Sequence, residues 1–174
     1  MWYAIQTVTG EEEQTLANIR RLVDGEIYED CFVLKREAVW RIGGECRVHT
    51  ERLFPGYVFV SARYPKELYQ QLKRVCSYTK ILGKEEEEFY AVSEEEEEFL
   101  KDLLNGDKEY TMRLSPVSVD SQGNITACGA PLNKYLDRVV KKRIRLRYVM
   151  IRVRLFGRDR DVLVGIRVAG DISS

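Results

Sequence analysis

Cations gather in one stretch near the end of the chain. Residues 139–161, VVKKRIRLRYVMIRVRLFGRDRD, hold nine lysines and arginines against two acids, Asp159 and Asp161. Guanidinium groups bind phosphates bidentately, and aromatic rings such as Tyr148 and Phe156 stack on unpaired bases. This pattern favours nucleic-acid binding, and a solvated cationic β surface is the alternative. The cations are Lys141, Lys142, Arg143, Arg145, Arg147, Arg152, Arg154, Arg158 and Arg160.

No residues are spaced for catalysis or metal binding. The single histidine, His49, lacks an evident partner, and the glutamate runs at 85–88 and 94–98 are consecutive residues beside or within a predicted helix start. A nuclease or transferase would need convergent carboxylates with a metal, or an activated nucleophile. A zinc site would need clustered ligands, whereas the cysteines are irregularly spaced without a CxxC pair. We therefore expect no enzyme, metal or cofactor. The cysteines are Cys31, Cys46, Cys76 and Cys128.

The zero net charge of the 174-residue chain hides two opposite halves. Residues 1–113 hold 16 Lys and Arg against 23 Asp and Glu, a balance of −7; residues 114–174 hold 12 against 5, a balance of +7. Such asymmetry indicates two modules with different electrostatic roles. The start, MWYAIQTVTG, has no signal-peptide pattern, and no apolar run reaches the roughly 18 residues that span a bilayer. We expect a cytoplasmic monomer without membrane contact.

The elements that must position these residues follow from periodicity and turn signals. The first module alternates strands with helices, so we predict an α+β fold with an antiparallel sheet flanked by helices. Ser93 and Glu96 form a predicted capping box for the last helix. The polar stretch 106–121 is predicted as linker and lead-in, and the short β runs that follow predict a small β-barrel. The predicted elements are strand 2–8, helix 11–23, two or three strands within 31–60 around Gly43-Gly44, helix 65–75, strand 89–92 and helix 93–105.

Side-chain parity divides the basic stretch. From Tyr148 to Phe156 the odd positions are all aliphatic, whereas Arg152 and Arg154 share the other face with Tyr148 and Phe156. Upstream cations fall on odd positions, so the phase changes near Arg147. We predict two strands, roughly 138–143 and 148–156, joined by a basic turn, IRLR. A helical spacing from Leu132 to Arg143 is an alternative for the first of them.

Two sequence blocks resemble the NusG-type transcription elongation factors. The segments WYAIQT and RLFPGYVFV resemble the N-terminal (NGN) domain of that family over residues 1–105, and IRVRLFGRDRDVLVGIRV resembles the end of its KOW domain, an SH3-like β-barrel, here over residues 122–174. The resemblance implies a non-enzymatic factor that rides bacterial RNA polymerase. It implies contacts with the β′ clamp helices from Trp2, Phe54, Tyr57 and Phe59, and with the β gate loop from Tyr69 and Gln70. Lys73 and Arg74 are implied contacts of non-template DNA.

The second module departs from the usual KOW pattern. Asp137-Arg138 stands where a glycine is usual, and Lys141-Lys142-Arg143 replaces acidic residues. With GAPLNKYLDRVVKK, this resembles the LoaP antiterminator group of NusG paralogs, which implies recognition of a structured leader RNA and suppressed termination. The RNA-binding residues predicted on this basis are Lys134, Arg138, Lys141, Lys142, Arg143, Arg145, Arg147, Tyr148, Arg152, Arg154 and Arg158.

The alternative is a general NusG factor. Its KOW domain would bind Rho or a ribosomal protein, with Phe156 as the contact residue.

Overall fold

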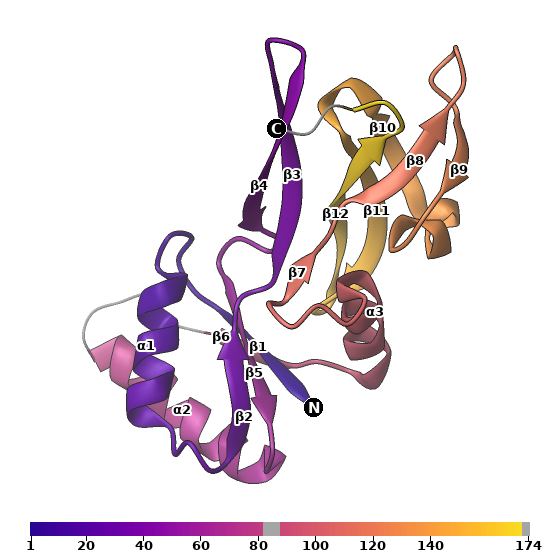
Figure 1. The fold of residues 1–174 in the computed structure, drawn as a ribbon. Helices are drawn as coiled ribbons and strands as arrows, with labels where there is room; N and C mark the ends of the chain where they lie inside the picture. Colours follow the sequence, from indigo (N-terminus) through magenta and orange to yellow (C-terminus); the bar gives the residue numbers. More distant parts are fainter. Residues whose placement is uncertain (82–87, 172–174) are drawn as a thin grey trace. The chain divides into compact units, whose positions relative to one another are not determined.

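The structure is a computed structural model that describes residues 1–81 and 88–171, with side chains for residues 1–75 and 89–171. It divides into two compact units, each assembled from separate stretches of the chain: residues 1–34 with 54–98, and residues 35–53 with 99–174. Strands and helices occur along the chain (Figure 1), so the predicted α+β class is confirmed.

The first unit is built on an antiparallel sheet of order β2-β5-β1-β6. Helices α1 and α2 lie on one face of this sheet (Figure 1). Leu16 and Ile19 of α1 are buried against Val58 and Val60 of β5, as the apolar stripe of the helix predicts. The bounds are β1 Trp2–Gln6, α1 Glu12–Leu22, β2 Tyr28–Phe32, β5 Tyr57–Ala62, α2 Pro65–Ile81 and β6 Glu88–Ala91.

The helix α3 (Glu94–Leu104) begins with the predicted capping box. The Ser93 N–H donates to Glu96 Oε2 at 2.9 Å, and the Glu96 N–H donates to Ser93 Oγ at 3.2 Å. Two N–H groups at the helix start are thereby satisfied. Of the other predicted glutamate run, residues 85–87 lie outside the described residues.

The second unit contains a five-stranded sheet of order β10-β11-β12-β8-β9. Alternate residues of β11 and β12 point into its core, where Val149, Ile151 and Val164 are fully buried. The helical alternative for 132–143 is realised only as two short 3₁₀ turns, after which the chain extends. The bounds are β8 Ser115–Val119, β9 Ile125–Cys128, η1 Leu132–Lys134, η2 Leu136–Arg138, β10 Val139–Arg143, η3 Ile144–Leu146, β11 Tyr148–Leu155 and β12 Arg158–Val168.

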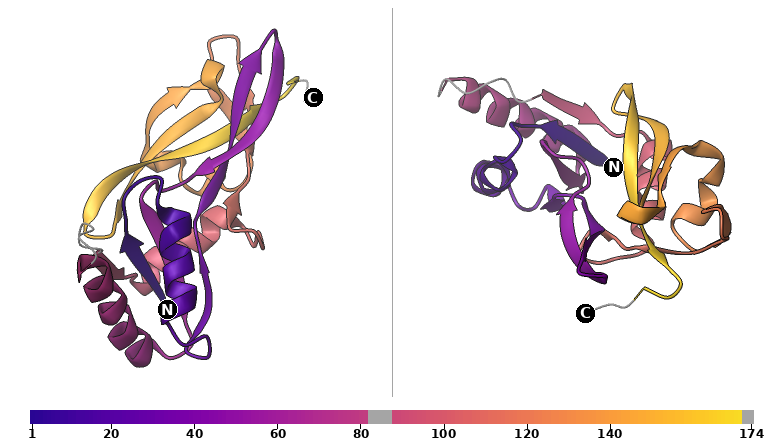
Figure 2. Two further views of the ribbon diagram at one scale, coloured as in Figure 1. Left: turned by 90° about the vertical axis from the view of Figure 1, so that its left-hand side faces the viewer. Right: turned by 90° about the horizontal axis from the view of Figure 1, so that it is seen from above.

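The predicted hairpin around Gly43-Gly44 belongs to this second unit. Its strands β3 (Lys35–Ile42) and β4 (Glu45–Arg52) form a sheet with the short β7 (Thr111–Met112), and β3 lies beside β12 (Figure 2). Gly165 of β12 permits this approach, because a Cβ there would lie 2.4 Å from the carbonyl oxygen of Glu37. The sequence pattern predicts this hairpin within the first module.

The stretch 106–121, predicted as linker and lead-in, holds β7 and β8. Hydrogen bonds with β3 hold this stretch in place. The Lys35 N–H donates to Tyr110 O at 2.9 Å, and the Leu114 N–H donates to Glu37 Oε2 at 2.9 Å. As functional modules, residues 1–105 and 122–174 stay predictions.

Candidate functional site

The basic stretch forms an antiparallel ribbon at one edge of the five-stranded sheet. β10 is the edge strand and pairs with β11, and the connection is η3 followed by Arg147 in the left-handed conformation, with φ of 58°. This is the predicted arrangement of two strands around IRLR. A bulge at Val140 shifts the register, so that Lys141 faces Met150 and Arg143 faces Tyr148.

The parity prediction for β11 is confirmed. Val149, Ile151, Val153 and Leu155 are at most 5% exposed, whereas Arg152 and Arg154 are exposed on the other face. Burial of these aliphatic side chains fixes the register, because a slip by one residue would expose all of them.

Four exposed cations occupy the strand and turn that precede β11, and we call them the basic edge: Lys141, Lys142, Arg143 and Arg145. In the part of the chain that the structure describes, no salt bridge is formed by any of these four. The neighbouring aliphatic side chains of Val140 and Leu146 are 47% and 61% exposed. The basic edge therefore offers unneutralised charge to a polyanion.

The arginines of β11 are placed differently. Arg152 lies opposite Asp161, with its Nε 2.8 Å from Oδ1 and its Nη2 3.2 Å from Oδ2, and this pairing lowers the pKa of Asp161. Arg154 lies opposite Asp159 and donates to the carbonyl oxygen of Gly157 at 3.4 Å. An acid across the strand reduces the charge that these two arginines present.

Arg147 is buried rather than part of the exposed surface. It is 8% exposed and donates to Asp171 through Nε at 2.8 Å and through Nη2 at 2.5 Å. Its Nη1 also donates to the carbonyl oxygen of Ile144 at 2.6 Å. This residue thus links η3 to the turn after β12, which sequence spacing did not indicate.

Lys134 and Arg138 contact the end of α3 within the second unit. Lys134 Nζ lies 3.0 Å from Asp102 Oδ1, and the Arg138 guanidinium lies 5.9 Å from the ring centre of Phe99. The Tyr135 hydroxyl donates to Asp102 at 3.2 Å; burial, and next the charge of Asp102, raises the pKa of Tyr135 to about 12. Both cations are exposed, but they lie on the 3₁₀ turns η1 and η2, which precede β10, and not on the basic edge.

The remaining candidates of the second unit lie on the strands and the β11–β12 turn. Tyr148 is half-buried opposite Arg143, and Arg158 is exposed at the start of β12. Phe156 adopts a φ of 52° in the turn, and the Arg160 guanidinium lies 5.2 Å from its ring centre.

Aromatic side chains cluster on the sheet face of the first unit that points away from α1 and α2. Trp2 lies 5.0 Å from Phe32 and 6.3 Å from Phe59, and Phe54 lies 6.3 Å from Phe59, between ring centres. Tyr57 shares this face by strand alternation. The structure therefore groups the four predicted clamp-helix residues and adds Phe32, which the pattern YEDCF had not marked.

Tyr69 and Gln70 lie elsewhere in the first unit. Both are exposed on α2, and the Tyr69 ring lies 6.5 Å from Tyr3 and 5.2 Å from Phe89, on the helix-covered side of the sheet. The Lys73 ammonium lies 4.5 Å from the Tyr69 ring centre. The six predicted polymerase residues thus divide between two faces.

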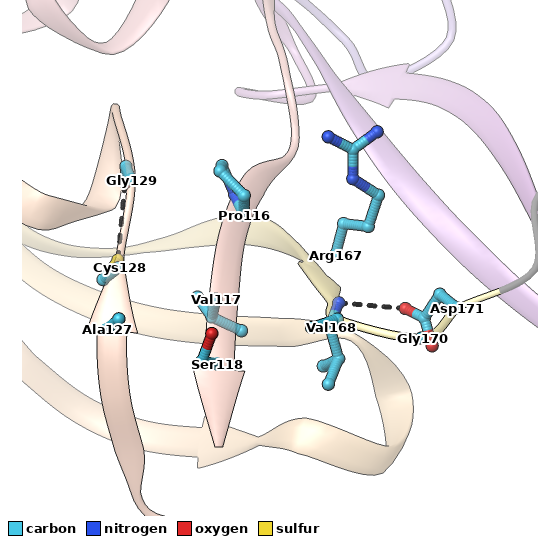
Figure 3. Close-up of a pocket in the computed structure, with 11 residues that line it drawn as sticks. Pro116, Val117, Ser118, Ala127, Cys128, Gly129, Arg167, Val168, Gly170 and Asp171 are labelled. Atoms are coloured by element: carbon cyan, nitrogen blue, oxygen red, sulfur yellow. Dashed lines mark hydrogen bonds between the residues drawn. The ribbon is translucent and has the colours of Figure 1, made fainter.

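A pocket of about 520 Å³ opens beside β8, β9 and the end of β12. Figure 3 shows its lining, including Val117, Cys128 and Arg167, and the hydrogen bond from the Val168 N–H to Asp171 at 3.0 Å. None of the predicted site residues lines it. Across the described side chains, no three potential ligands converge on a metal position.

Among the residues that the structure describes, no helix is both long and apolar enough to cross a membrane.

Comparison with known proteins identifies the family. The family described as "Transcription termination factor nusG" matches residues 1–101. The chain is similar to the protein named "Transcription termination/antitermination protein NusG" of Buchnera aphidicola, at 24% identity over 95% of this chain and 93% of that one. It is also similar to the protein of the same name from Thermus thermophilus, at 26% identity over 47% of this chain and 50% of that one. Because the family match spans more than half of its residues, the chain belongs to the NusG family.

Proposed function

We propose that this protein is a non-enzymatic transcription antitermination factor that binds RNA polymerase through its first unit and a structured leader RNA through its second. The observation that carries the RNA half is the basic edge, where four exposed cations lie together without ion pairs among the described residues. Its membership of the NusG family, and the names of its two relatives, support the transcription half.

The polymerase surface that we propose is the aromatic face of the first unit. Trp2, Phe54, Phe59 and Tyr57, with Phe32, form an aromatic layer on one side of the sheet. All five side chains are at most 8% exposed in the structure, so the proposal needs this layer to become accessible when the polymerase binds. Each side chain would then contribute about 1.5–3 kcal/mol if it were fully buried in the contact. Tyr69 and Gln70 would form a second contact, with the gate loop. Because they lie on the other side of the sheet, the proposal needs a partner that reaches both sides.

The RNA surface that we propose is centred on Lys141, Lys142, Arg143 and Arg145. Several phosphate contacts in a small area give strong, salt-dependent binding. Tyr148, which lies opposite Arg143, supplies an aromatic ring next to these charges. The departures at residues 137–143 support placing the protein in the LoaP-like group of the family.

The alternative is a general NusG factor whose second unit binds Rho or a ribosomal protein through Phe156. This ring already has the Arg160 guanidinium 5.2 Å away and is only partly accessible. The geometry therefore supports Phe156 as an anchor less well than it supports the basic edge as an RNA contact.

Single-round transcription in vitro tests the proposal. Bacterial RNA polymerase would transcribe a template with a candidate 5′ leader followed by an intrinsic terminator, with and without the protein. We expect read-through to rise on the leader template and to stay at background on a template whose leader hairpin is scrambled. Equal read-through on both templates would support the general factor, and no effect on either would reject the antitermination role.

A further inference from the structure

The hairpin β3–β4 presents an exposed tryptophan. Trp40 is 56% exposed, whereas the other tryptophan of the chain, Trp2, is 5% exposed. Tryptophan is enriched at interfaces, where a partner can bury its large flat ring. The second unit does not use this ring for its own core.

The Trp40 ring is held in place from behind. The imidazole of His49 stacks on it, with ring centres 3.9 Å apart and planes inclined by 28°. His49 Nε2 lies 2.7 Å from Glu51 Oε1, and Arg36 Nη2 lies 2.5 Å from Glu51 Oε2. We call Trp40, His49, Glu51 and Arg36 the Trp40 platform. Because the ring is more than half exposed with one face covered by the imidazole, its other face is open to solvent.

Positive charge lies next to this open face. Arg47 is directly opposite Trp40 in the strand register, so it lies on the same face, and it is exposed. The neighbouring Arg41 points to the other face by strand alternation. On the same face, Glu51 is paired with Arg36, whereas Glu45, opposite Ile42, is exposed. Arg47 therefore places a cation beside the ring, where it can contact the phosphate of a stacked nucleotide.

The hairpin also lies next to the basic edge within the second unit. η3, which carries Arg145, contacts β3. Hydrogen bonding to Asp171 raises the pKa of Arg147, burial opposes this rise, and Cys46 of β4 adds to it, which places Cys46 close to the residue that follows η3. The hairpin is therefore a neighbour of the basic edge through its Cys46 face, and the Trp40 platform lies on its other face.

We propose that the Trp40 platform is a stacking site for one unpaired base of a single-stranded nucleic acid, with Arg47 contacting the adjacent phosphate. Base–aromatic stacking tolerates any base and adds to backbone contacts made by cations. The platform is pre-organised, so little side-chain freedom is lost when a base stacks. Among the exposed apolar side chains of the hairpin, Ile42 alone shares the face of Trp40, which favours a flat ring over a protein segment as the occupant. This inference deepens the proposed RNA binding and rests on it.

Tryptophan fluorescence of the full-length protein tests the inference directly. The probes are unstructured 12-residue oligo(U) and oligo(dT), because base stacking quenches an exposed indole and Trp2 is shielded. We expect saturable quenching in the wild type and none in Trp40→Leu. We also expect Trp40→Leu to bind the oligonucleotides about five-fold or more weakly, which corresponds to the loss of one stacked base. Trp40→Phe should recover part of this affinity.

Ile42→Ala is the matched control, because Ile42 is 55% exposed and lies on the same face of the hairpin. It should bind both oligonucleotides as the wild type does. Tighter binding of oligo(U) assigns RNA to the site and tighter binding of oligo(dT) assigns single-stranded DNA; either upholds the inference. Wild-type affinity in Trp40→Leu overturns it. Weakened polymerase binding in both Trp40→Leu and Ile42→Ala, with oligonucleotide binding intact, overturns it in favour of a protein contact.

Folded leader RNA separates this inference from the proposed function. If Lys141→Ala with Arg143→Ala leaves leader affinity unchanged while Trp40 is still quenched by oligonucleotides, the proposed basic-edge function fails and the stacking site stands. If the basic-edge variant loses leader RNA and the wild-type indole is not quenched at saturating oligonucleotide, the stacking site fails alone.

Discussion

Arg147 binds Asp171 through two hydrogen bonds, from Nε at 2.8 Å and from Nη2 at 2.5 Å, and both side chains are about nine-tenths buried. The pair joins the turn before β11 to the turn after β12, which are 24 residues apart in sequence. Arg147 is therefore a structural cation within a stretch whose other cations are exposed.

Removing one partner of this pair should destabilise the protein. Asp171→Ala leaves a buried guanidinium without its carboxylate, and we expect the free energy of unfolding to fall by about 2 kcal/mol. Chemical denaturation measures this loss. Arg152→Ala is the control, because its pair with Asp161 is on the surface, and we expect no measurable change. Equal destabilisation by both variants would contradict the structural role of Arg147.

The same pair predicts a pH dependence. Burial by itself raises the pKa of Asp171. The hydrogen bonds from Arg147 and from the Val168 N–H together lower it by more, so its folded-state pKa lies below the ordinary value of roughly 3.9. A depressed carboxylate pKa contributes stability that is present above the unfolded-state pKa and is lost as pH falls through the folded-state pKa.

The difference in unfolding free energy between wild type and Asp171→Asn should therefore be constant near neutral pH and shrink below about pH 4. Denaturation of both proteins between pH 7 and pH 2 measures it. A difference that grew as the pH fell would show that the pKa of Asp171 is not lowered in the folded state.

The buried face of β11 predicts contrasting effects at neighbouring positions. Ile151 is 0% exposed, so Ile151→Ala should lower the free energy of unfolding by about 2–4 kcal/mol, because it removes buried methyl groups and leaves a cavity. Met150→Ala should lower the free energy of unfolding much less, because Met150 is half-buried on the other face. Thermal or chemical unfolding compares the two variants. A larger loss from Met150→Ala would mean that the register of the strand is wrong.

Local patterns were enough to predict much of this structure. Alternation of aliphatic residues from Val149 to Leu155 predicts the buried face of β11, and the spacing of Ser93 and Glu96 predicts the start of α3. In each case the residues that carry the signal lie within a few positions of one another. The turn around IRLR follows from the change of phase at Arg147, because side-chain direction in a strand depends only on position.

Partners that are distant in sequence could not be predicted in this way. Arg147 and Arg152 look like every other arginine of the basic stretch until the register of β12 places Asp171 and Asp161 beside them. The union of the β3–β4 hairpin with the second unit depends on the close approach at Gly165, which no local pattern reveals. His49 had no partner in the sequence, because Trp40 and Glu51 become its neighbours only when β3 pairs with β4.

RNA binding by the basic edge is best tested by the salt dependence of leader-RNA binding. The full-length protein would be titrated with its tightest-binding 5′ leader hairpin between 50 and 200 mM salt. The variants are Lys141→Ala with Arg143→Ala, from the basic edge, and Arg152→Ala with Arg154→Ala, whose arginines lie opposite acids. Both remove two positive charges from exposed positions.

If the basic edge contacts the RNA phosphates, the basic-edge variant binds more weakly, and its slope of log K against log salt is shallower by about 1.5, for two lost phosphate contacts. The Arg152 and Arg154 variant then keeps a slope close to that of the wild type. Wild-type affinity and slope in the basic-edge variant would show that the basic edge does not bind the leader RNA.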